Sequence, residues 1–598
     1  MWFPFSPRYP ERRADEVDSK EYDYIVVGGG TAGCALASRL SEDPEISVLL
    51  LERGPVNDTW LSRVPLIGSN ILTSDWGAAN WLCEPMKFCN DRRSRFFCGE
   101  VLGGGSRING MVYTRGTAAD FNAWGALGHP EWSYDKVLPY FVKSEKALNQ
   151  PKSEYRGDSG PWITRTFPYL SWPFRVYRVF VEIAEAMGFV RIIDTNSPDC
   201  PADGIALFDS TVNEANQRVS TLEAYLPREI ALQRRGHLTI CANTLVSQIT
   251  SNEADRSKTH RAEKVLFKSV DPKTSKVFSA KVKKEVIVCS GAIGSPQVLM
   301  LSGIGPREHL EQNGIKVVRD LPGVGSELTD HIGLPIAWET PLHESLAAMA
   351  NSPVLKGGLE FMKYVFFGSG LLSIPVQTLS IFARTLSLSA DGTKLVTTSP
   401  RAKIYRPEDH IPDLEIMPLA INSSDNFEEH QRLYSKIGIF SLLATLLQPK
   451  SRGTVRLASL NPHDRPKVDF GLLSDPEDFE VARTAIRLSL KLGKDVKDSG
   501  FPLLRNLTFS EEDQGNDEKV DEFIRDRART TYHYASTCRM AAEDDPAPGV
   551  VDDELRVHGF HNLRVCDASV FPKIVSSHLQ APVVMAAEKL ADMIKKNL

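Results

Sequence analysis

Three glycines near the start of the chain could hold the phosphates of a dinucleotide. Gly28, Gly30 and Gly33 match the pattern GxGxxG and directly follow an apolar run that ends at Val27. The first glycine of this pattern permits a tight turn, the second lets the backbone approach a pyrophosphate, and the third lets a helix pack closely on a strand. The N-terminus of that helix then faces the phosphate charge.

An acidic residue lies at the position where dinucleotide-binding motifs have the residue that binds the ribose. Glu52 ends the next apolar run, 19 residues after Gly33, and a carboxylate there can accept hydrogen bonds from the ribose hydroxyls of an adenosine. The same charge would repel a 2′-phosphate. The pattern leaves FAD and NAD both open, and a glycine-rich turn followed by a surface glutamate is the alternative interpretation.

A second glycine cluster could hold the other half of a dinucleotide. Gly103, Gly104 and Gly105 are adjacent and precede Ser106 to Gly110. Successive backbone amides in a glycine-rich turn can bind phosphates and flavin edges. A flexible loop is the other interpretation of three adjacent glycines.

Two histidines near the C-terminal end could act on a substrate. Removing hydride from a carbinol carbon requires a group that takes the hydroxyl proton, and imidazole suits this role near neutral pH. His533 lies between Tyr532 and Tyr534, and His578 follows Ser576 and Ser577. By residue type alone, a histidine beside tyrosines is more often structural.

The elements around the first glycines predict a parallel βαβ unit. Asp23 to Val27 and Ser47 to Glu52 are typical of buried strands, and Thr31 to Leu40 is typical of a helix. Later β-rich runs predict that distant segments join the same sheet: Leu238 to Cys241, Glu285 to Ser290 and Leu563 to Asp567.

A second sheet is expected between these segments. Arg452 to Leu457 and the apolar run Ile437 to Leu447 are predicted to be its strands. The apolar stretch from 359 to 385 is interrupted by charge, glycine and proline, so a membrane span is unlikely to form there. We expect it to be buried or to line a cavity, with a membrane-touching surface as the alternative.

Composition excludes several classes of protein. The 598 residues carry a net charge of −6, which gives no basic field for nucleic acid. The nine cysteines are an odd number and widely spaced, so we expect free thiols and no disulfide framework. No ligand-spaced cluster predicts a metal. The start lacks the apolar core of a secretory signal, so an intracellular, cytoplasmic location is the expectation.

Longer motifs make the chain similar to one family. Residues 101–116 resemble the first signature of the glucose-methanol-choline (GMC) oxidoreductases, which are FAD enzymes, and residues 291–305 resemble the second. Residues 321–331 match a third motif. The order of these motifs is that of the family, and the resemblance covers nearly the whole chain.

The resemblance implies an α/β fold of two domains. A discontinuous Rossmann-like FAD-binding domain would comprise residues 20–155, 235–330 and 531–598. An α+β substrate-binding domain built on an antiparallel sheet would comprise residues 156–234 and 331–530.

The resemblance also implies which residues contact the flavin nucleotide, and it implies that no residue is bonded to the flavin covalently. Ile108 occupies the position where some relatives have a flavin-linked histidine, so FAD is expected to be held noncovalently. Glu100 departs from the Arg or Lys that is usual in the first signature. The implied cofactor contacts are Gly28, Gly30, Thr31, Ala32, Gly33, Glu52, Arg53, Val101, Asn109, Gly110, Met111, Val112, Val246, Asp567 and Ala568.

The implied activity is oxidation of an alcohol by hydride transfer to flavin N5. His533 lies in the family's catalytic histidine motif and would be the general base, and His578 would donate a hydrogen bond to the substrate oxygen. His331 would fasten a loop near the cofactor. The apolar runs around residues 359–385 and 437–447 favour a hydrophobic or aromatic alcohol, with dioxygen or another acceptor reoxidising the flavin.

Three other functions remain open at this point. Some GMC relatives use the flavin for a non-redox cyclisation or dehydration. A light-driven fatty-acid decarboxylase would need a cysteine that the run 441–448 lacks. A catalytically silent FAD-binding scaffold would be expected to lose a catalytic histidine, and this chain has both.

Overall fold

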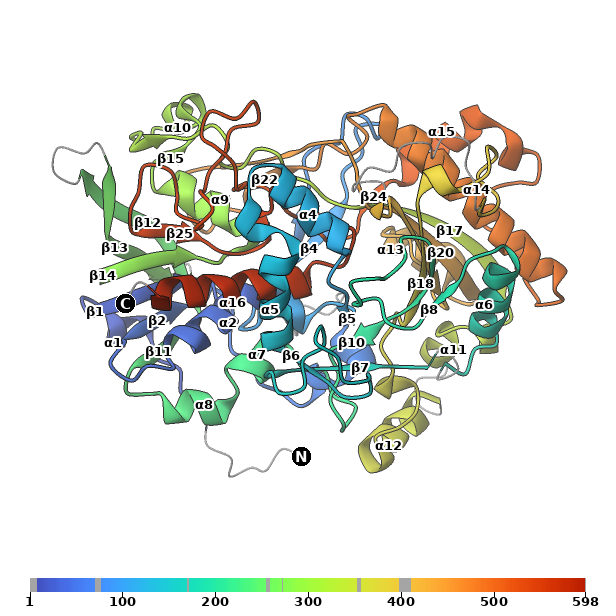
Figure 1. Cartoon of the computed structure of the whole chain (residues 1–598), viewed down its shortest axis with the longest axis horizontal. Coiled ribbons are helices and arrows are strands. Elements are labelled where there is room, and N and C mark those ends of the chain that lie inside the picture. Colours follow the sequence, from blue (N-terminus) through green and yellow to red (C-terminus); the bar gives the residue numbers. More distant parts are fainter. Residues whose placement is uncertain are drawn as a thin grey trace.

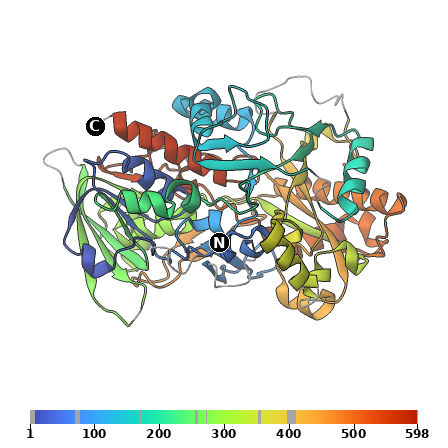
Figure 2. The same ribbon diagram turned by 90° about the horizontal axis from the view of Figure 1, so that it is seen from below.

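A computed structural model gives the architecture of the chain (Figure 1). It describes residues 8–69, 77–168, 172–253, 259–271, 273–351, 356–396 and 410–596. Two large sheets lie at opposite ends of the molecule, as the view from below also shows (Figure 2). The helix α16 (Gln580–Lys596) lies against the first of them.

The first sheet has seven strands collected from distant parts of the chain. Its order is β11-β2-β1-β14-β13-β12, and β25 also pairs with β14. The pairs β1–β2, β2–β11, β1–β14 and β14–β25 are parallel, whereas β12, β13 and β14 form an antiparallel meander. The strands are β1 (Glu21–Val27), β2 (Val48–Leu51), β11 (Leu238–Cys241), β12 (Thr244–Glu253), β13 (His260–Ser269), β14 (Val277–Val288) and β25 (Leu563–Val565). The prediction that these segments share one sheet is therefore confirmed.

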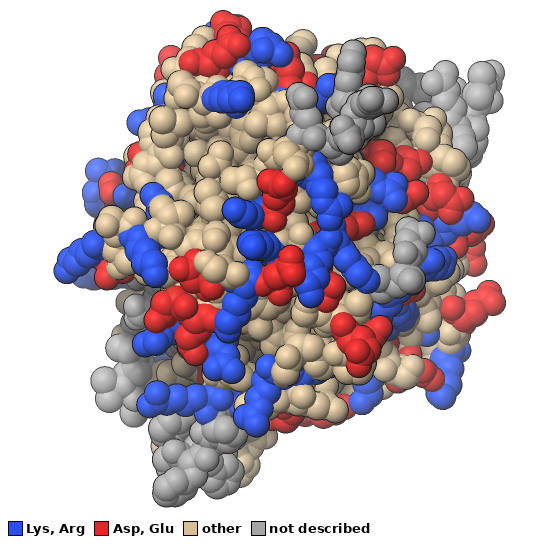
Figure 3. All heavy atoms as spheres, turned by 90° about the vertical axis from the view of Figure 1, so that its left-hand side faces the viewer, with Lys and Arg blue, Asp and Glu red and all other residues tan. Residues whose placement is uncertain are grey.

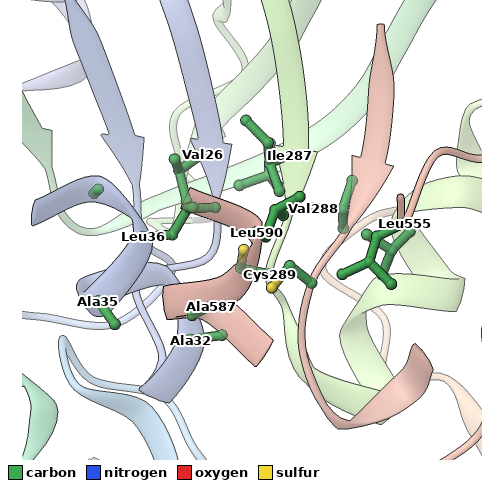
Figure 4. Close-up of a cluster of buried hydrophobic side chains, with 14 of the residues drawn as sticks. Val26, Ala32, Ala35, Leu36, Ile287, Val288, Cys289, Leu555, Ala587 and Leu590 are labelled. Atoms are coloured by element: carbon green, nitrogen blue, oxygen red, sulfur yellow. The ribbon is translucent and has the colours of Figure 1, made fainter. Parts of the chain in front are cut away.

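Small side chains let helices pack closely on the parallel strands. The helix α2 (Thr31–Leu40) occupies the predicted residues, and it packs against α16. Figure 4 shows Ala32 of α2 beside Ala587 of α16, and Leu36 of α2 beside Val26 of β1. Burial of this apolar face, at about 25 cal/mol per Å², fixes α2 and hence the turn before it.

The second sheet has eight strands and is mainly antiparallel. Its order is β23-β17-β20-β19-β18-β9-β8, and β24 also pairs with β17. Helix α14 (Glu477–Asp498) packs on it and contacts α6 (Val176–Ala186) and α15 (Asp517–Arg527). The strands are β8 (Arg191–Ile192), β9 (Gly204–Leu207), β17 (Ile332–Thr340), β18 (Leu379–Ala383), β19 (Leu414–Leu419), β20 (Gly438–Leu446), β23 (Arg505–Asn506) and β24 (Arg529–Thr530). The two-domain boundaries remain a prediction.

One local expectation was wrong, and a second holds only in part. Residues 452–457 contain β21 (Thr454–Arg456), but this strand pairs with β22 (Lys467–Asp469) in a separate two-stranded sheet. The N–H of Val455 donates to Gly325 O, so the free edge of β21 faces the loop at Gly325 and not the large sheet.

The helix in the apolar stretch is not buried as expected. In α12 (Gly358–Phe367), Phe366 and Phe367 are 72% and 79% exposed. The strand β18 that follows is buried. No helix of the described ranges is long and apolar enough to cross a membrane.

Charges of both signs are mixed on the side of the molecule where the first sheet lies. Figure 3 shows this face with Lys and Arg interspersed among Asp and Glu. The mixture agrees with the small net charge of −6 and gives no extended field of one sign.

Candidate active site

A cavity of about 580 Å³ lies between the two sheets and contains most of the predicted site residues. Residues of both sheets form its walls. The predicted residues that line it are Gly28, Gly30, Thr31, Ala32, Glu52, Arg53, Asn109, Gly110, Val112, Val246, His533, Asp567, Ala568 and His578.

Three predicted cofactor residues lie behind this wall. Gly33 faces the turn, because a Cβ atom there would lie 1.9 Å from the oxygen of Gly28. Val101 and Met111 are fully buried, and Met111 packs against the apolar cluster at Val212. These residues support the binding loops from behind and do not line the cavity.

The two glycine loops touch each other at the N-terminus of α2. A Cβ atom on Gly104, whose φ is +54°, would lie 2.6 Å from the Cα of Gly30. Only glycine permits this approach. The amides of both loops therefore surround the positive end of the α2 dipole, as a pyrophosphate requires.

The Glu52 carboxyl group is held rigidly at the end of β2. Its Oε2 accepts the N–H of Gly29 at 2.7 Å, and its Oε1 accepts the N–H of Gly54 at 2.7 Å. Burial raises its pKa to about 7 despite these hydrogen bonds. The remaining lone pairs can accept ribose hydroxyls, which fits an adenosine.

Asn109 belongs to a buried hydrogen-bond network under the second glycine loop. Its Oδ1 accepts the N–H of Met111 at 3.0 Å and an N–H of Arg218 at 2.9 Å, and its Nδ2 donates to Gln580 at 2.9 Å. Arg218 also donates to Ser106 O at 3.1 Å. Sequence reasoning missed Arg218, since no local motif marks it.

Asp567 joins the end of β25 to the helix α9 (Gly291–Leu301). Its Oδ2 accepts the N–H of Gly291 at 2.8 Å and the hydroxyl of Ser295 at 2.6 Å, while Oδ1 accepts the N–H of Ser569 at 2.8 Å. Burial raises the pKa of Asp567. The adjacent Ala568 also lines the cavity.

The unusual Glu100 pairs with two arginines of the cavity wall. It lies 3.4 Å from Arg53 and forms an ion pair with Arg465 at 2.9 Å. The Arg465 guanidinium lies over the Trp81 ring, 4.8 Å from its centre. The single negative charge of Glu100 therefore compensates one of the two cations, and Glu100 itself is not an unpaired charge in this wall.

The His533 ring is held in one tautomer by its neighbours. His331 Nε2 lies 3.1 Å from Val575 O and must donate to it, because a carbonyl only accepts. Burial lowers the pKa of His331 to about 3, so this ring is neutral and its Nδ1 can only accept. His533 Nδ1, at 2.9 Å, is therefore the donor.

Thr531 supports the same assignment. Its hydroxyl donates to His331 O at 3.2 Å, so its oxygen can accept from His533 Nδ1 at 3.3 Å. Burial lowers the pKa of His533 well below its ordinary value. The ring is thus neutral with a proton on Nδ1, and the lone pair of Nε2 is available to a substrate hydroxyl.

Asp330 fixes the backbone of His533. Its carboxyl oxygens accept the N–H of His533 at 2.9 Å and the hydroxyl of Thr530. Burial raises the pKa of Asp330 to about 7. The Asp330–His331 pair therefore positions the predicted base directly, where sequence reasoning expected only a loop contact.

The His578 ring packs edge to face against the His533 ring in the cavity wall. The two ring centres lie 4.8 Å apart at 77°. His578 Nε2 lies 3.3 Å from Oε1 of Glu415, which also accepts an N–H of Gln377 at 3.3 Å. Glu415 is fully buried. It was not predicted as a site residue from the sequence. The one feature that could have indicated it is an acidic residue within the otherwise apolar strand β19.

The part of the chain that the structure describes contains no cluster of three or more metal-ligating side chains. Its chemistry-bearing parts are a dinucleotide cradle and a histidine pair that meet in one cavity. This arrangement defines the class of dinucleotide-dependent oxidoreductases, with the substrate site opposite the cofactor site.

Comparisons with known proteins identify the family. Residues 22–333 and 449–587 match the N- and C-terminal models described as GMC oxidoreductase. An oxygen-dependent choline dehydrogenase of Pseudomonas fluorescens is 34% identical over 587 residues, with 96% of this chain and 94% of the relative covered. The chain therefore belongs to the GMC oxidoreductase family.

Solved structures agree. A formate oxidase variant of Aspergillus oryzae has a TM-score of 0.83 at 26% identity, covering 97% of this chain and 99% of the other. An FAD-dependent oxidoreductase of Chaetomium thermophilum has a TM-score of 0.80 at 26% identity, covering 96% and 99%. The predicted α/β fold and family are confirmed, and FAD is the cofactor.

Proposed function

We propose that the protein oxidises an alcohol to a carbonyl compound, with His533 as the general base. The observation that carries this proposal is the hydrogen-bond pattern that leaves Nε2 of a neutral His533 free in the cavity. A positioned base contributes roughly 10²- to 10⁴-fold to such a reaction. FAD, when bound, supplies the acceptor for the hydride.

The chain's own residues divide the remaining work. His578 would donate a hydrogen bond from Nδ1 to the substrate oxygen as an imidazolium paired with Glu415, since its Nε2 lies 3.3 Å from that carboxylate. It would thereby hold the carbinol carbon toward the cofactor. Glu415 would hold the His578 ring from behind. As negative charge develops on the substrate oxygen, the positioned N–H of His578 would stabilise it while His533 takes the hydroxyl proton.

FAD would be held by noncovalent contacts alone. Gly28, Gly30 and Thr31 line the phosphate end, and Glu52 would accept the ribose hydroxyls. Ile108 also lines the cavity, and its alkyl side chain offers no atom for a flavin linkage. The domain formed around the first sheet would carry these contacts, and the domain around the second would carry the substrate.

The wall opposite the cofactor cradle favours a substrate with an apolar body. Val376, Met417, Leu419 and Leu443 form one apolar cluster and line the cavity. Burial of a hydrophobic or aromatic group here would stabilise binding by about 25 cal/mol per Å².

The experiment is a panel of alcohols mixed with the purified, FAD-loaded protein under anaerobic conditions. Bleaching of the flavin spectrum by an alcohol is the predicted result, and a flavin that stays oxidised with every alcohol would contradict the proposal. Repeating the panel with dioxygen and then with a quinone identifies the class of acceptor.

A further inference from the structure

Arg529 is a buried cation in the cavity wall. It belongs to β24, four residues before His533, and is 8% exposed. It lines the same cavity as the two histidines. A buried charge is costly unless a partner compensates it, so its partners decide its role.

Among the described residues this guanidinium donates its hydrogen bonds to neutral groups, and the Asp330 carboxyl lies near enough for the Arg529 charge to favour its ionised form. The Nε of Arg529 donates to Thr530 O at 3.1 Å and its Nη1 donates to Ser423 O. It also lies over the Tyr532 ring, 5.5 Å from the centre. Among the described residues no carboxylate forms an ion pair with Arg529, whereas Arg53 and Arg465 in the same wall share Glu100.

Arg529 lies near the apolar cavity wall that contains Leu443 and Met417, and not near the two glycine loops proposed to bind the phosphates. A Cβ atom on Gly333 would lie 3.1 Å from Leu443 Cδ1 and 3.6 Å from Arg529 Cγ, so the arginine stem lies beside Leu443 of the apolar wall. The glycine loops at Gly30 and Gly104 belong to the N-terminus of α2, against the first sheet.

We propose that Arg529 binds a carboxylate of the substrate, so that the enzyme acts on an alcohol whose apolar body also carries a carboxylate group. A guanidinium offers its paired N–H donors in the planar geometry that a carboxylate matches. The substrate would place its hydroxyl at His533, its apolar body along Leu443 and Met417, and its carboxylate at Arg529. This inference rests on the proposed function and specifies its substrate class.

The test compares 4-(hydroxymethyl)benzoate with its methyl ester, which lacks the negative charge and carries one additional methyl group at the same end. Each is mixed anaerobically with FAD-loaded protein, and the apparent Kd is taken from the concentration dependence of flavin reduction. Arg529→Gln should weaken binding of the acid by about 10- to 100-fold, as expected for a lost charged hydrogen bond, and leave the ester nearly unchanged. Arg529→Lys should retain part of the preference.

Arg505→Gln is the matched control, because Arg505 is an exposed arginine paired with Glu339 outside the cavity. It should change neither Kd. An acid-to-ester ratio that is the same in the parent protein and in Arg529→Gln would overturn the inference.

A binding arm without turnover separates this inference from the proposed function. Benzoate and benzamide are titrated into oxidised, FAD-loaded protein, and the flavin spectrum reports binding. Weaker benzoate binding in Arg529→Gln, with benzamide unchanged, supports the carboxylate site even if no alcohol reduces the flavin. Equal benzoate binding in both proteins refutes it, whatever the alcohols do.

Discussion

The Nδ1 atoms of His331 and His533 lie 2.9 Å apart, although the residues are 202 positions apart in the chain. Because His331 Nε2 donates to Val575 O, the shared proton belongs to His533 Nδ1. This relationship leaves Nε2 of His533 free, as the proposed role of His533 as a base requires, and it makes the Asp-His motif a contact of that ring.

The first prediction concerns this relationship. Asparagine at 331 can place an amide oxygen near the position of the histidine Nδ1, whereas leucine cannot accept a hydrogen bond. His331→Leu should slow flavin reduction by roughly 10-fold, the value of about one net hydrogen bond, and His331→Asn should be milder.

Nitrogen-15 NMR of histidine-labelled protein reports the tautomer independently of rate. The parent should show His533 protonated at Nδ1, and His331→Leu should show a mixture of tautomers. A parent spectrum with the proton on Nε2 of His533 would contradict the assignment.

The second prediction is that FAD affinity falls as pH falls below about 7. The Glu52 carboxyl has its pKa raised to about 7 by burial before the cofactor binds, and ribose hydroxyls favour the ionised form. Binding therefore releases a proton, so lowering the pH through this value weakens binding. Titration calorimetry between pH 6 and pH 8 measures the trend.

Glu52 variants provide the control for that trend. Glu52→Gln should lose the pH dependence, and Glu52→Ala should weaken FAD retention by about 1–3 kcal/mol with activity restored at excess FAD. Retention equal to that of the parent in Glu52→Ala would remove Glu52 from the ribose site.

The part of the fold that forms the cofactor turn could be predicted from the sequence because its motifs involve residues close together in the chain. The Gly28–Gly33 turn, the helix Thr31–Leu40 and the buried strands around them are set by neighbours in sequence. The run 452–457 was misassigned because alternation predicts a strand but does not name its partner, and Val455 pairs with Gly325 and β22 instead.

The parts that sequence reasoning missed depend on contacts between distant residues. In the sequence, Glu415 is a single acidic residue in an apolar strand. Only the position of β19 beside the cavity brings its Oε1 to 3.3 Å from His578 Nε2. Arg218 and Arg529 likewise gain meaning from burial, which no local pattern records.

The third prediction concerns a buried ion network that supports the fold away from the cavity. Glu145, fully buried, forms ion pairs with Arg115 at 2.9 Å and Arg156 at 2.7 Å. Glu145→Gln leaves the buried Arg115 without an ion pair among the described residues, whereas Arg156 keeps Asp194 and Asp209. The substitution should lower the free energy of unfolding by about 3–5 kcal/mol. Urea denaturation of the FAD-loaded protein measures it, and an unchanged midpoint would show that the network contributes little.

The fourth prediction separates the roles of the two histidines. His578→Asn should slow flavin reduction by roughly 2- to 10-fold, because an amide can still donate one hydrogen bond to the substrate oxygen. Stopped-flow absorbance gives the rate. A variant as slow as one lacking the base would mean that His578 carries the proton transfer.

The most direct test of the proposed mechanism is anaerobic stopped-flow flavin reduction in His533→Ala. The rate should fall roughly 10²- to 10⁴-fold while FAD content stays at the parent level, since no contact proposed for FAD involves His533. Raising the pH should partly restore the rate, because more of the substrate is then alkoxide and needs no base. Flavin reduction at the parent rate in His533→Ala would contradict the assignment of His533 as the catalytic base.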